Sequence, residues 1–90
     1  MADYAVTFAR FARQELEALD TSTIARILGR IEALAVDPRP SGGRKMRGAA
    51  RLWRIRIGDY RVVDSIDDRQ RVVDVVRVRH RRDVYRQLEV

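Results

Sequence analysis

The sequence contains no cysteine, one histidine, one lysine and two prolines among its 90 residues. Without cysteine the chain can form neither disulfides nor thiolate metal sites, and one histidine cannot build a histidine-rich metal site. No apolar run approaches the roughly 18 residues of a membrane span, and the N-terminus lacks the charged-then-apolar pattern of a secretory signal. We therefore expect a cytoplasmic protein with no metal, no cofactor and no membrane partner.

Length and composition allow one domain of modest size. Compact domains typically have about 100–150 residues, so a chain of this length leaves no room for a second core. Apolar residues make up 46% of the chain, which is enough for a small core and too much for a disordered segment. We expect residues 1–90 to form a single domain.

Positive charge is concentrated in the second part of the chain. Residues 1–38 carry four basic and six acidic residues, a net charge of −2, whereas residues 39–90 carry fifteen basic and seven acidic residues, a net charge of +8. All the basic residues except Lys45 are arginines, whose planar guanidinium groups bind phosphate oxygens and stack on bases. A GC-rich genome also favours arginine over lysine. The distribution of charge nevertheless indicates a polyanion partner, or an acidic protein that competes with one.

Hydrophobic periodicity divides the chain into strands and helices. Apolar residues alternate with polar ones in residues 4–8, which predicts a strand, and recur every three or four positions in residues 8–19 and 24–35, which predicts two helices. Prolines at positions 38 and 40 end the second helix. Three further strands and a polar C-terminal segment, expected as a loop leading into a short helix, follow at residues 52–57, 60–66, 72–78 and 80–88.

This order of elements predicts the fold class. The succession β-α-α-β-β-β-(α) is typical of an α+β protein in which a helical hairpin packs on one face of a small, mainly antiparallel sheet. The residues between the second helix and the next strand, including the basic run at 44–47, are expected to form a loop.

Alternation within the strands separates basic from apolar side chains. Trp53, Ile55 and Ile57 share one face of their strand, and Arg54 and Arg56 share the other. If the strands pair as a meander, further basic residues join this second face, with Lys45 and Arg47 of the preceding loop close by. The predicted surface can hold several phosphates, and Trp53 or Tyr85 could stack on bases. The further basic residues expected to join this second face, from the other strands and from the segment after the last strand, are Arg61, Arg77, Arg79 and Arg81.

Two segments of the basic half resemble a known family. Residues 52–63 read LWRIRIGDYRVV and residues 76–86 read VRVRHRRDVYR. The GDYR and HRRDVYR motifs at this separation resemble the RelE branch of the RelE/ParE superfamily of type II toxins, and the resemblance covers nearly the whole chain. It implies an endoribonuclease that cleaves messenger RNA in the ribosomal A site, inhibits translation, and is neutralised by direct binding of a cognate antitoxin.

The resemblance also implies roles for individual residues. Arg61 and Arg81 correspond to arginines that stabilise the scissile phosphate. Tyr85 corresponds to a tyrosine that stacks on or orients a base and assists proton transfer. Arg54 and Arg56 correspond to a basic pair on the first strand of the meander, and would bind RNA.

The proton acceptor is the point at which the sequence departs from the family. Several relatives carry lysines where this chain has Arg54 and Arg56, and a guanidinium stays protonated at neutral pH, so these residues are poor bases. Relatives often carry an aromatic residue in place of Asp64, whose carboxylate could act as a base. His80 is a second candidate for proton transfer, and Lys45 a third.

Other interpretations of the same residues remain open. Arg54 and Arg56 could form a solvated sheet face that pairs with Asp64 and Asp74 across strands, and Trp53 could belong to the core. The chain could belong to a ParE-like branch that poisons DNA gyrase by protein contact. It could also be a catalytically degenerate toxin that only binds its antitoxin.

Overall fold

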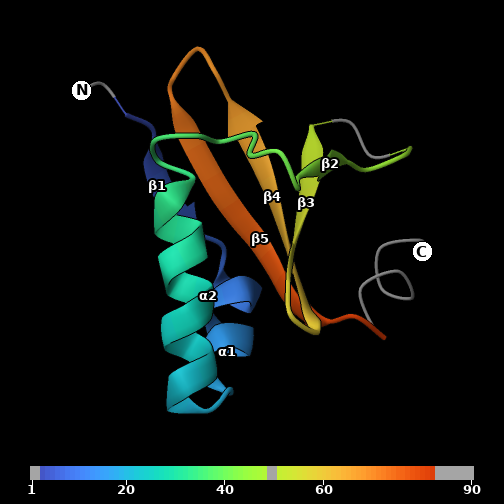
Figure 1. The fold of residues 1–90 in the computed structure, drawn as a ribbon. Coiled ribbons are helices and arrows are strands. Elements are labelled where there is room, and N and C mark those ends of the chain that lie inside the picture. The colour runs from blue at the N-terminus through green and yellow to red at the C-terminus, as the bar shows by residue number, and fades with distance from the viewer. Residues whose placement is uncertain (1–2, 49–50, 83–90) are drawn as a thin grey trace.

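The structure, a computed structural model, describes residues 3–48 and 51–82 (Figure 1). Neither helix in this part of the chain is long and apolar enough to span a bilayer. The elements in chain order are β1 (Ala5–Phe8), α1 (Arg10–Glu17), α2 (Thr21–Ala33), β2 (Arg44–Lys45), β3 (Leu52–Ile57), β4 (Tyr60–Asp67) and β5 (Val72–His80).

The strands form one mixed sheet in the order β1-β5-β4-β3-β2. β1 runs parallel to β5 at one edge, and all the other neighbours are antiparallel. The α+β fold predicted from the sequence is therefore confirmed. Two details differ from the prediction: a short strand, β2, stands where a loop was expected, and β5 extends to His80. The expected C-terminal helix lies outside the described residues.

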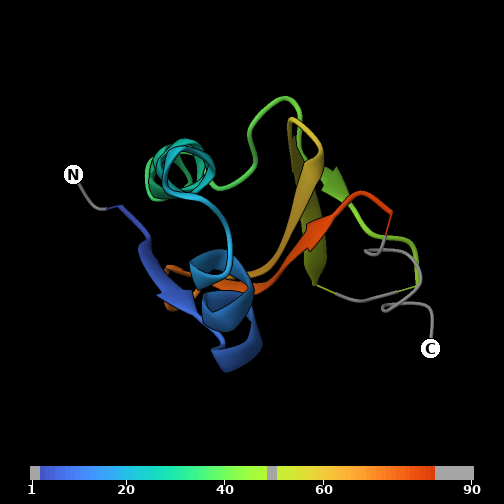
Figure 2. The same ribbon diagram turned by 90° about the horizontal axis from the view of Figure 1, so that it is seen from below.

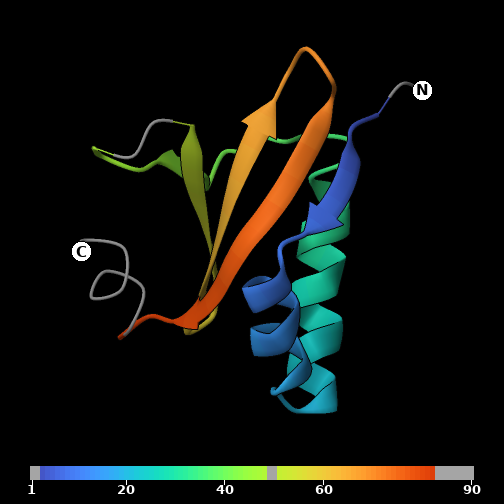
Figure 3. The ribbon, with the colours of Figure 1, turned by 180° about the vertical axis from the view of Figure 1, so that it is seen from behind.

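The two helices pack against the sheet in different places (Figures 2 and 3). α2 lies across one face, which we call the inner face, and buries Ile27 and Ile31 against it. α1 lies beside β5, in line with the end of β1, and buries Ala12 and Leu16. Apolar residues spaced by four positions fall on one side of a helix, which explains why each helix buries only one stripe.

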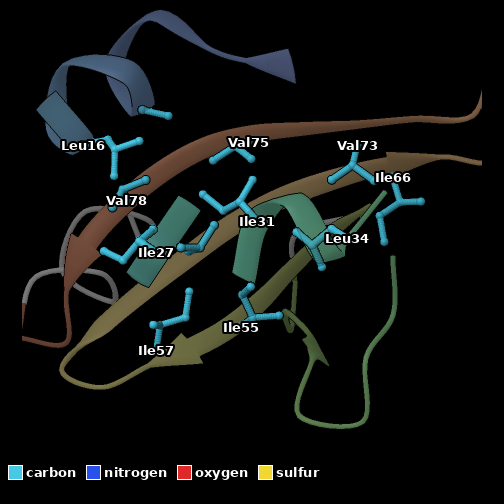
Figure 4. Close-up of a cluster of buried hydrophobic side chains, with 12 residues drawn as sticks. Leu16, Ile27, Ile31, Leu34, Ile55, Ile57, Ile66, Val73, Val75 and Val78 are labelled. Carbon is cyan, nitrogen blue, oxygen red and sulfur yellow. The ribbon is translucent and has the colours of Figure 1, made fainter. Parts of the chain in front are cut away.

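The core occupies the inner face (Figure 4). Side chains of α1 and α2 pack against those of β3, β4 and β5 in a cluster of apolar residues. Trp53 and Tyr60 pack against this cluster as partly buried side chains, which confirms the interpretation of Trp53 as a core residue. The strand residues in the cluster are Ile55, Ile57, Val62, Ile66, Val73, Val75 and Val78.

A β-bulge changes the faces of β5. Val63 pairs with Arg77, but the next residue of β4, Asp64, pairs with Val75, so Val76 is an extra residue on β5. Val75 and Val78 can therefore both point to the inner face although they are three residues apart. The bulge places Arg77 and Arg79 on the opposite, outer face.

Candidate nucleic-acid interface

Strand register gathers arginines on the outer face in two rows. In the first row Arg56 of β3, Arg61 of β4 and Arg79 of β5 are direct neighbours across the three strands. Adjacent strands lie about 4.8 Å apart, and residues two apart on a strand about 6.7 Å, so the two rows form one continuous surface. The second row contains Arg44, Arg54, Val63 and Arg77.

Arg61 lies at the centre of this surface. Only 9% of its surface is exposed, and its Nη1 donates hydrogen bonds to the carbonyl oxygens of Gly58 (3.3 Å) and Tyr60 (3.2 Å). Burial and the nearby guanidinium groups of Arg56, Arg54 and Arg81, in that order, lower the pKa of Arg61. Burial and the neighbouring positive charges thus disfavour the charged form of Arg61, and a bound anion would stabilise that form.

The β3–β4 turn holds the end of β5 next to Arg61. Gly58 adopts a φ of 59°, a left-handed conformation that suits glycine at the first position of a tight hairpin turn. Asp59 follows it, and its carbonyl oxygen accepts a hydrogen bond from the backbone N–H of Arg81 at 2.7 Å. This bond attaches Arg81, one residue beyond β5, to the turn that also binds the Arg61 side chain. We call Arg54, Arg56, Arg61 and Arg81 the central cluster.

Arg77 and Arg79 are engaged by an acidic residue of α1. Glu15 Oε2 lies 2.7 Å from Arg77 Nη2 and 3.4 Å from Arg79 Nη1, and Glu15 Oε1 accepts the backbone N–H of Val78 at 2.8 Å. From the sequence we expected both arginines to bind RNA directly, and Glu15 was not among the predicted site residues. We call Glu15, Arg77 and Arg79 the Glu15 cluster.

Comparisons with known proteins bear on this arrangement of elements and arginines. Residues 6–85 match the family described as the ParE toxin of type II toxin–antitoxin systems, parDE. The chain belongs to this family of type II toxins. It is 33% identical over 84 residues to Toxin RelG of Mycobacterium tuberculosis. The matched segment covers 92% of this chain and 97% of RelG.

Solved structures agree with the family assignment. The toxin–antitoxin complex RelBE2 of Mycobacterium tuberculosis matches with a TM-score of 0.78 and 30% identity, over 87% of this chain and 98% of that one. The RelE–RelB complex of Pyrococcus horikoshii matches with a TM-score of 0.78 and 27% identity, over 90% and 97% of the two chains. The resemblance to the RelE/ParE superfamily seen in the sequence is therefore confirmed.

His80 lies away from the central cluster of the toxin. Its neighbours in register are Tyr60 and then Ile57, so it belongs to the row next to Arg61 and Arg79 and points to the inner face. Its ring meets that of Tyr60 edge to face, with centroids 5.5 Å apart, and its Nδ1 accepts the backbone N–H of Arg82. The structure does not bring His80 to the outer face, where a base would have to act.

The basic segment before β3 is divided between the two faces. Arg44 pairs with Arg54 and therefore faces outward, although it was not among the site residues predicted from the sequence. Lys45 pairs with Trp53 on the inner side, and Arg47 lies exposed in the turn that follows β2. Only the register of β2, a two-residue strand without a clear periodic pattern, distinguishes these neighbours. Tyr85 lies outside the described residues.

Asp64 is a core residue of the toxin rather than a partner of the arginines. It lies on the inner face, 1% exposed, and neither of its carboxylate oxygens has a hydrogen-bond partner among the described residues. Burial raises the pKa of Asp64 to about 7, against the opposing charge of Arg39. The suggested pairing of Asp64 with Arg54 or Arg56 is therefore wrong, and so is the pairing of Asp74, which instead accepts a hydrogen bond from Thr7.

Proposed function

We propose that this toxin is a metal-independent endoribonuclease that cleaves messenger RNA on the ribosome. The observation that carries the proposal is the central cluster: a nearly buried guanidinium, Arg61, fixed by two backbone carbonyls and surrounded by Arg54, Arg56 and Arg81. Like charges held together in this way are costly unless they act on an anion, and a phosphodiester backbone supplies several.

The chemistry needs such a cluster. In metal-free RNA cleavage the ribose 2′-oxygen attacks the adjacent phosphorus, the bond from phosphorus to the 5′-oxygen breaks, and a cyclic phosphate and a 5′-hydroxyl result. One proton leaves the 2′-hydroxyl and one reaches the departing oxygen. Arg61 and Arg81 would stabilise the crowded, negatively charged phosphorane, because preorganised cations favour the state in which charge is greatest. Arg54 and Arg56 would hold the neighbouring phosphates.

We do not assign the role of proton acceptor to any of the three candidates named for it from the sequence. His80 and Lys45 lie on the inner side of the sheet, and Asp64 is enclosed in the core, so we assign none of them this role. Tyr85 keeps the role that the family resemblance implies, in base stacking and proton transfer, as a prediction.

The partners follow from the same surface. The solved relatives include the toxin–antitoxin complex RelBE2 and the RelE–RelB complex. We expect a cognate antitoxin with an acidic segment that covers the central cluster and folds on binding, since neutralising clustered arginines offsets the cost of ordering the segment. The messenger RNA in the ribosomal A site and the ribosome itself complete the set of partners.

The test is a pulse of toxin expression in bacteria followed by sequencing of transcript ends. We expect growth arrest with new ends inside translated transcripts, and loss of both in the double variant Arg61→Ala, Arg81→Ala. A matched double variant, Arg30→Ala, Arg69→Ala, removes two exposed arginines that belong to neither the central cluster nor the Glu15 cluster, and should keep both effects. Intact transcripts during arrest would refute the nuclease, and so would full toxicity of the first double variant.

A second candidate is interference with DNA gyrase, which the ParE family match favours. This activity works by protein contact and needs no site for phosphate cleavage. It predicts induction of the DNA-damage response with unchanged transcripts, the opposite outcome of the same expression experiment.

A further inference from the structure

The carboxylate of Glu15 contacts some of the arginines of the outer face. Glu15 contacts both arginines that β5 contributes, and its side chain is only 21% exposed, while those of Arg77 and Arg79 are 23% and 16% exposed. Arg77 is held most firmly, since its Nε and Nη2 both donate to Glu15 and its guanidinium lies 5.8 Å from the ring centre of Phe11. Arg79 makes the single, longer contact.

The same carboxylate has a structural reason to be there. β1 pairs with β5 only as far as Val75, so no strand of the described residues pairs with this edge of β5 beyond Val75. Glu15 of α1 takes the place of that strand by accepting the N–H of Val78. Because α1 is anchored at this edge, the Glu15 carboxylate stays within reach of both neighbouring guanidinium groups.

The strand register of Arg79 and the contact that its guanidinium makes place its charge in different clusters. Its Cα is paired with that of Arg61, which would place its guanidinium in the central cluster. Instead the guanidinium is turned toward Glu15, and the like charges that chiefly act on Arg61 are those of Arg56, Arg54 and Arg81. Glu15 therefore withdraws arginine charge from a surface that the strand register would otherwise continue.

We propose that Glu15 sets the boundary of the RNA-binding surface by holding Arg77 and Arg79 away from phosphate. This inference rests on the proposed function, and adds to it a residue that limits affinity for RNA of any sequence. A carboxylate that occupies a guanidinium competes directly with a phosphate oxygen for the same donors. While Glu15 contacts Arg77 and Arg79, the toxin makes fewer sequence-independent contacts with free RNA than it would if both arginines were available to phosphate.

The size of the effect follows from counterion release. Each added phosphate contact steepens the dependence of log affinity on log salt concentration by about 0.7 for single-stranded nucleic acid, which corresponds to about fivefold in affinity near 0.1 M salt. Releasing Arg79 alone should add one such contact, and releasing both arginines should add two.

The principal test compares Glu15→Gln with Glu17→Gln. Both remove one negative charge from α1, but only Glu15 contacts arginines of the outer face, and glutamine at position 15 keeps an oxygen that can accept the Val78 N–H. Binding of the full-length toxin to a fluorescent oligouridylate is measured by anisotropy over a salt series. We expect E15Q to bind at least about fivefold more tightly than E17Q near 0.1 M salt, with a slope steeper by about 0.7 or more.

A second pair of variants keeps the test decisive if E15Q does not fold. In the protein that keeps Glu15, Arg79→Gln should leave the salt slope unchanged, because the Arg79 guanidinium already contacts the Glu15 carboxylate instead of phosphate. Arg56→Gln should reduce the slope by about 0.7. Equal slopes for E15Q and E17Q, or equal losses for R79Q and R56Q, would overturn the inference alone. A wild-type toxin that does not bind the oligouridylate at all would also overturn the inference, whereas the proposed function is refuted separately, by intact transcripts during growth arrest.

Discussion

Asp64 offers the sharpest test of the energetics of this fold. Its carboxyl lies in the core between Trp53 of β3 and Val75 of β5, with no hydrogen-bond partner among the described residues. Burial raises the pKa of Asp64 from 3.8 to about 7. We predict that replacing Asp64 by asparagine, which keeps the shape of the side chain and removes its titration, stabilises the protein at alkaline pH.

The magnitude follows from the difference between the folded and unfolded pKa values. Between pH 4 and pH 7 the folded state holds a proton that the unfolded state has lost, so the free energy of unfolding falls as pH rises, and levels off above pH 7. At about 1.4 kcal/mol per pKa unit the total loss attributable to Asp64 is about 4 kcal/mol by pH 8, of which about 3 kcal/mol is lost between pH 5 and pH 8.

The assay is urea unfolding of wild type and Asp64→Asn at a series of pH values, followed by circular dichroism. The stability difference in favour of the variant should grow by about 3 kcal/mol from pH 5 to pH 8. Asp37→Asn, a change at an exposed position, reports the effect of removing one negative charge from a protein of net charge +6. Parallel pH profiles for wild type and D64N, or a variant less stable than wild type at pH 8, would refute the reasoning.

Three further predictions use single substitutions. Arg61→Leu should lower messenger RNA cleavage at least about 100-fold, because it removes the central phosphate-binding cation, while leaving the unfolding temperature at least as high as in wild type, because it also removes buried like-charge repulsion. Gly29→Ala should stabilise the protein by about 1 kcal/mol in urea unfolding, since Gly29 lies within α2 and a Cβ there meets nothing within 4 Å. Asp68→Asn should lower the unfolding temperature at neutral pH and less in acid, because hydrogen bonds from Arg39 and then Tyr4 lower the pKa of Asp68.

Each of these predictions has an outcome that contradicts it. Retained cleavage by R61L would remove Arg61 from the proposed mechanism, and a large drop in its unfolding temperature would show that Arg61 is chiefly structural. A destabilised G29A would mean that α2 approaches another segment at this position. An Asp68→Asn variant whose deficit grows in acid would contradict the direction of the pKa change, since stability from a lowered carboxyl pKa is lost as pH falls.

Much of the fold was accessible from the residues because the patterns involved are local. The three- and four-residue spacing of apolar side chains in both helices, and the alternation in β3, depend only on the geometry of each element. Arg54 and Arg56 could be assigned to one face of β3, and Trp53 to the other, without knowledge of the neighbouring strands. The short strand β2 escaped prediction because two residues carry no measurable period.

The candidate site could be predicted only in part from the sequence. The sequence placed Arg54, Arg56, Arg61 and Arg81 together, and the structure does so too, through register and through the Arg81 bond to the β3–β4 turn. His80 was misplaced because β5 continues one full row past Arg79, which turns the imidazole to the inner face. No signal in the sequence singled out Glu15, an acidic residue on a helix whose other polar positions face solvent.

The amino-acid sequence alone was sufficient to establish the family, the order of the elements other than β2, and the excess of arginine on strand faces, since these depend on patterns among neighbouring residues. Tertiary structure decided which arginines act together. The bulge at Val76 sets the face of Arg77, and the carboxylate that neutralises Arg77 comes from 62 residues earlier in the chain. Contacts over such separations depend on how helices dock on the sheet, and no local pattern records them.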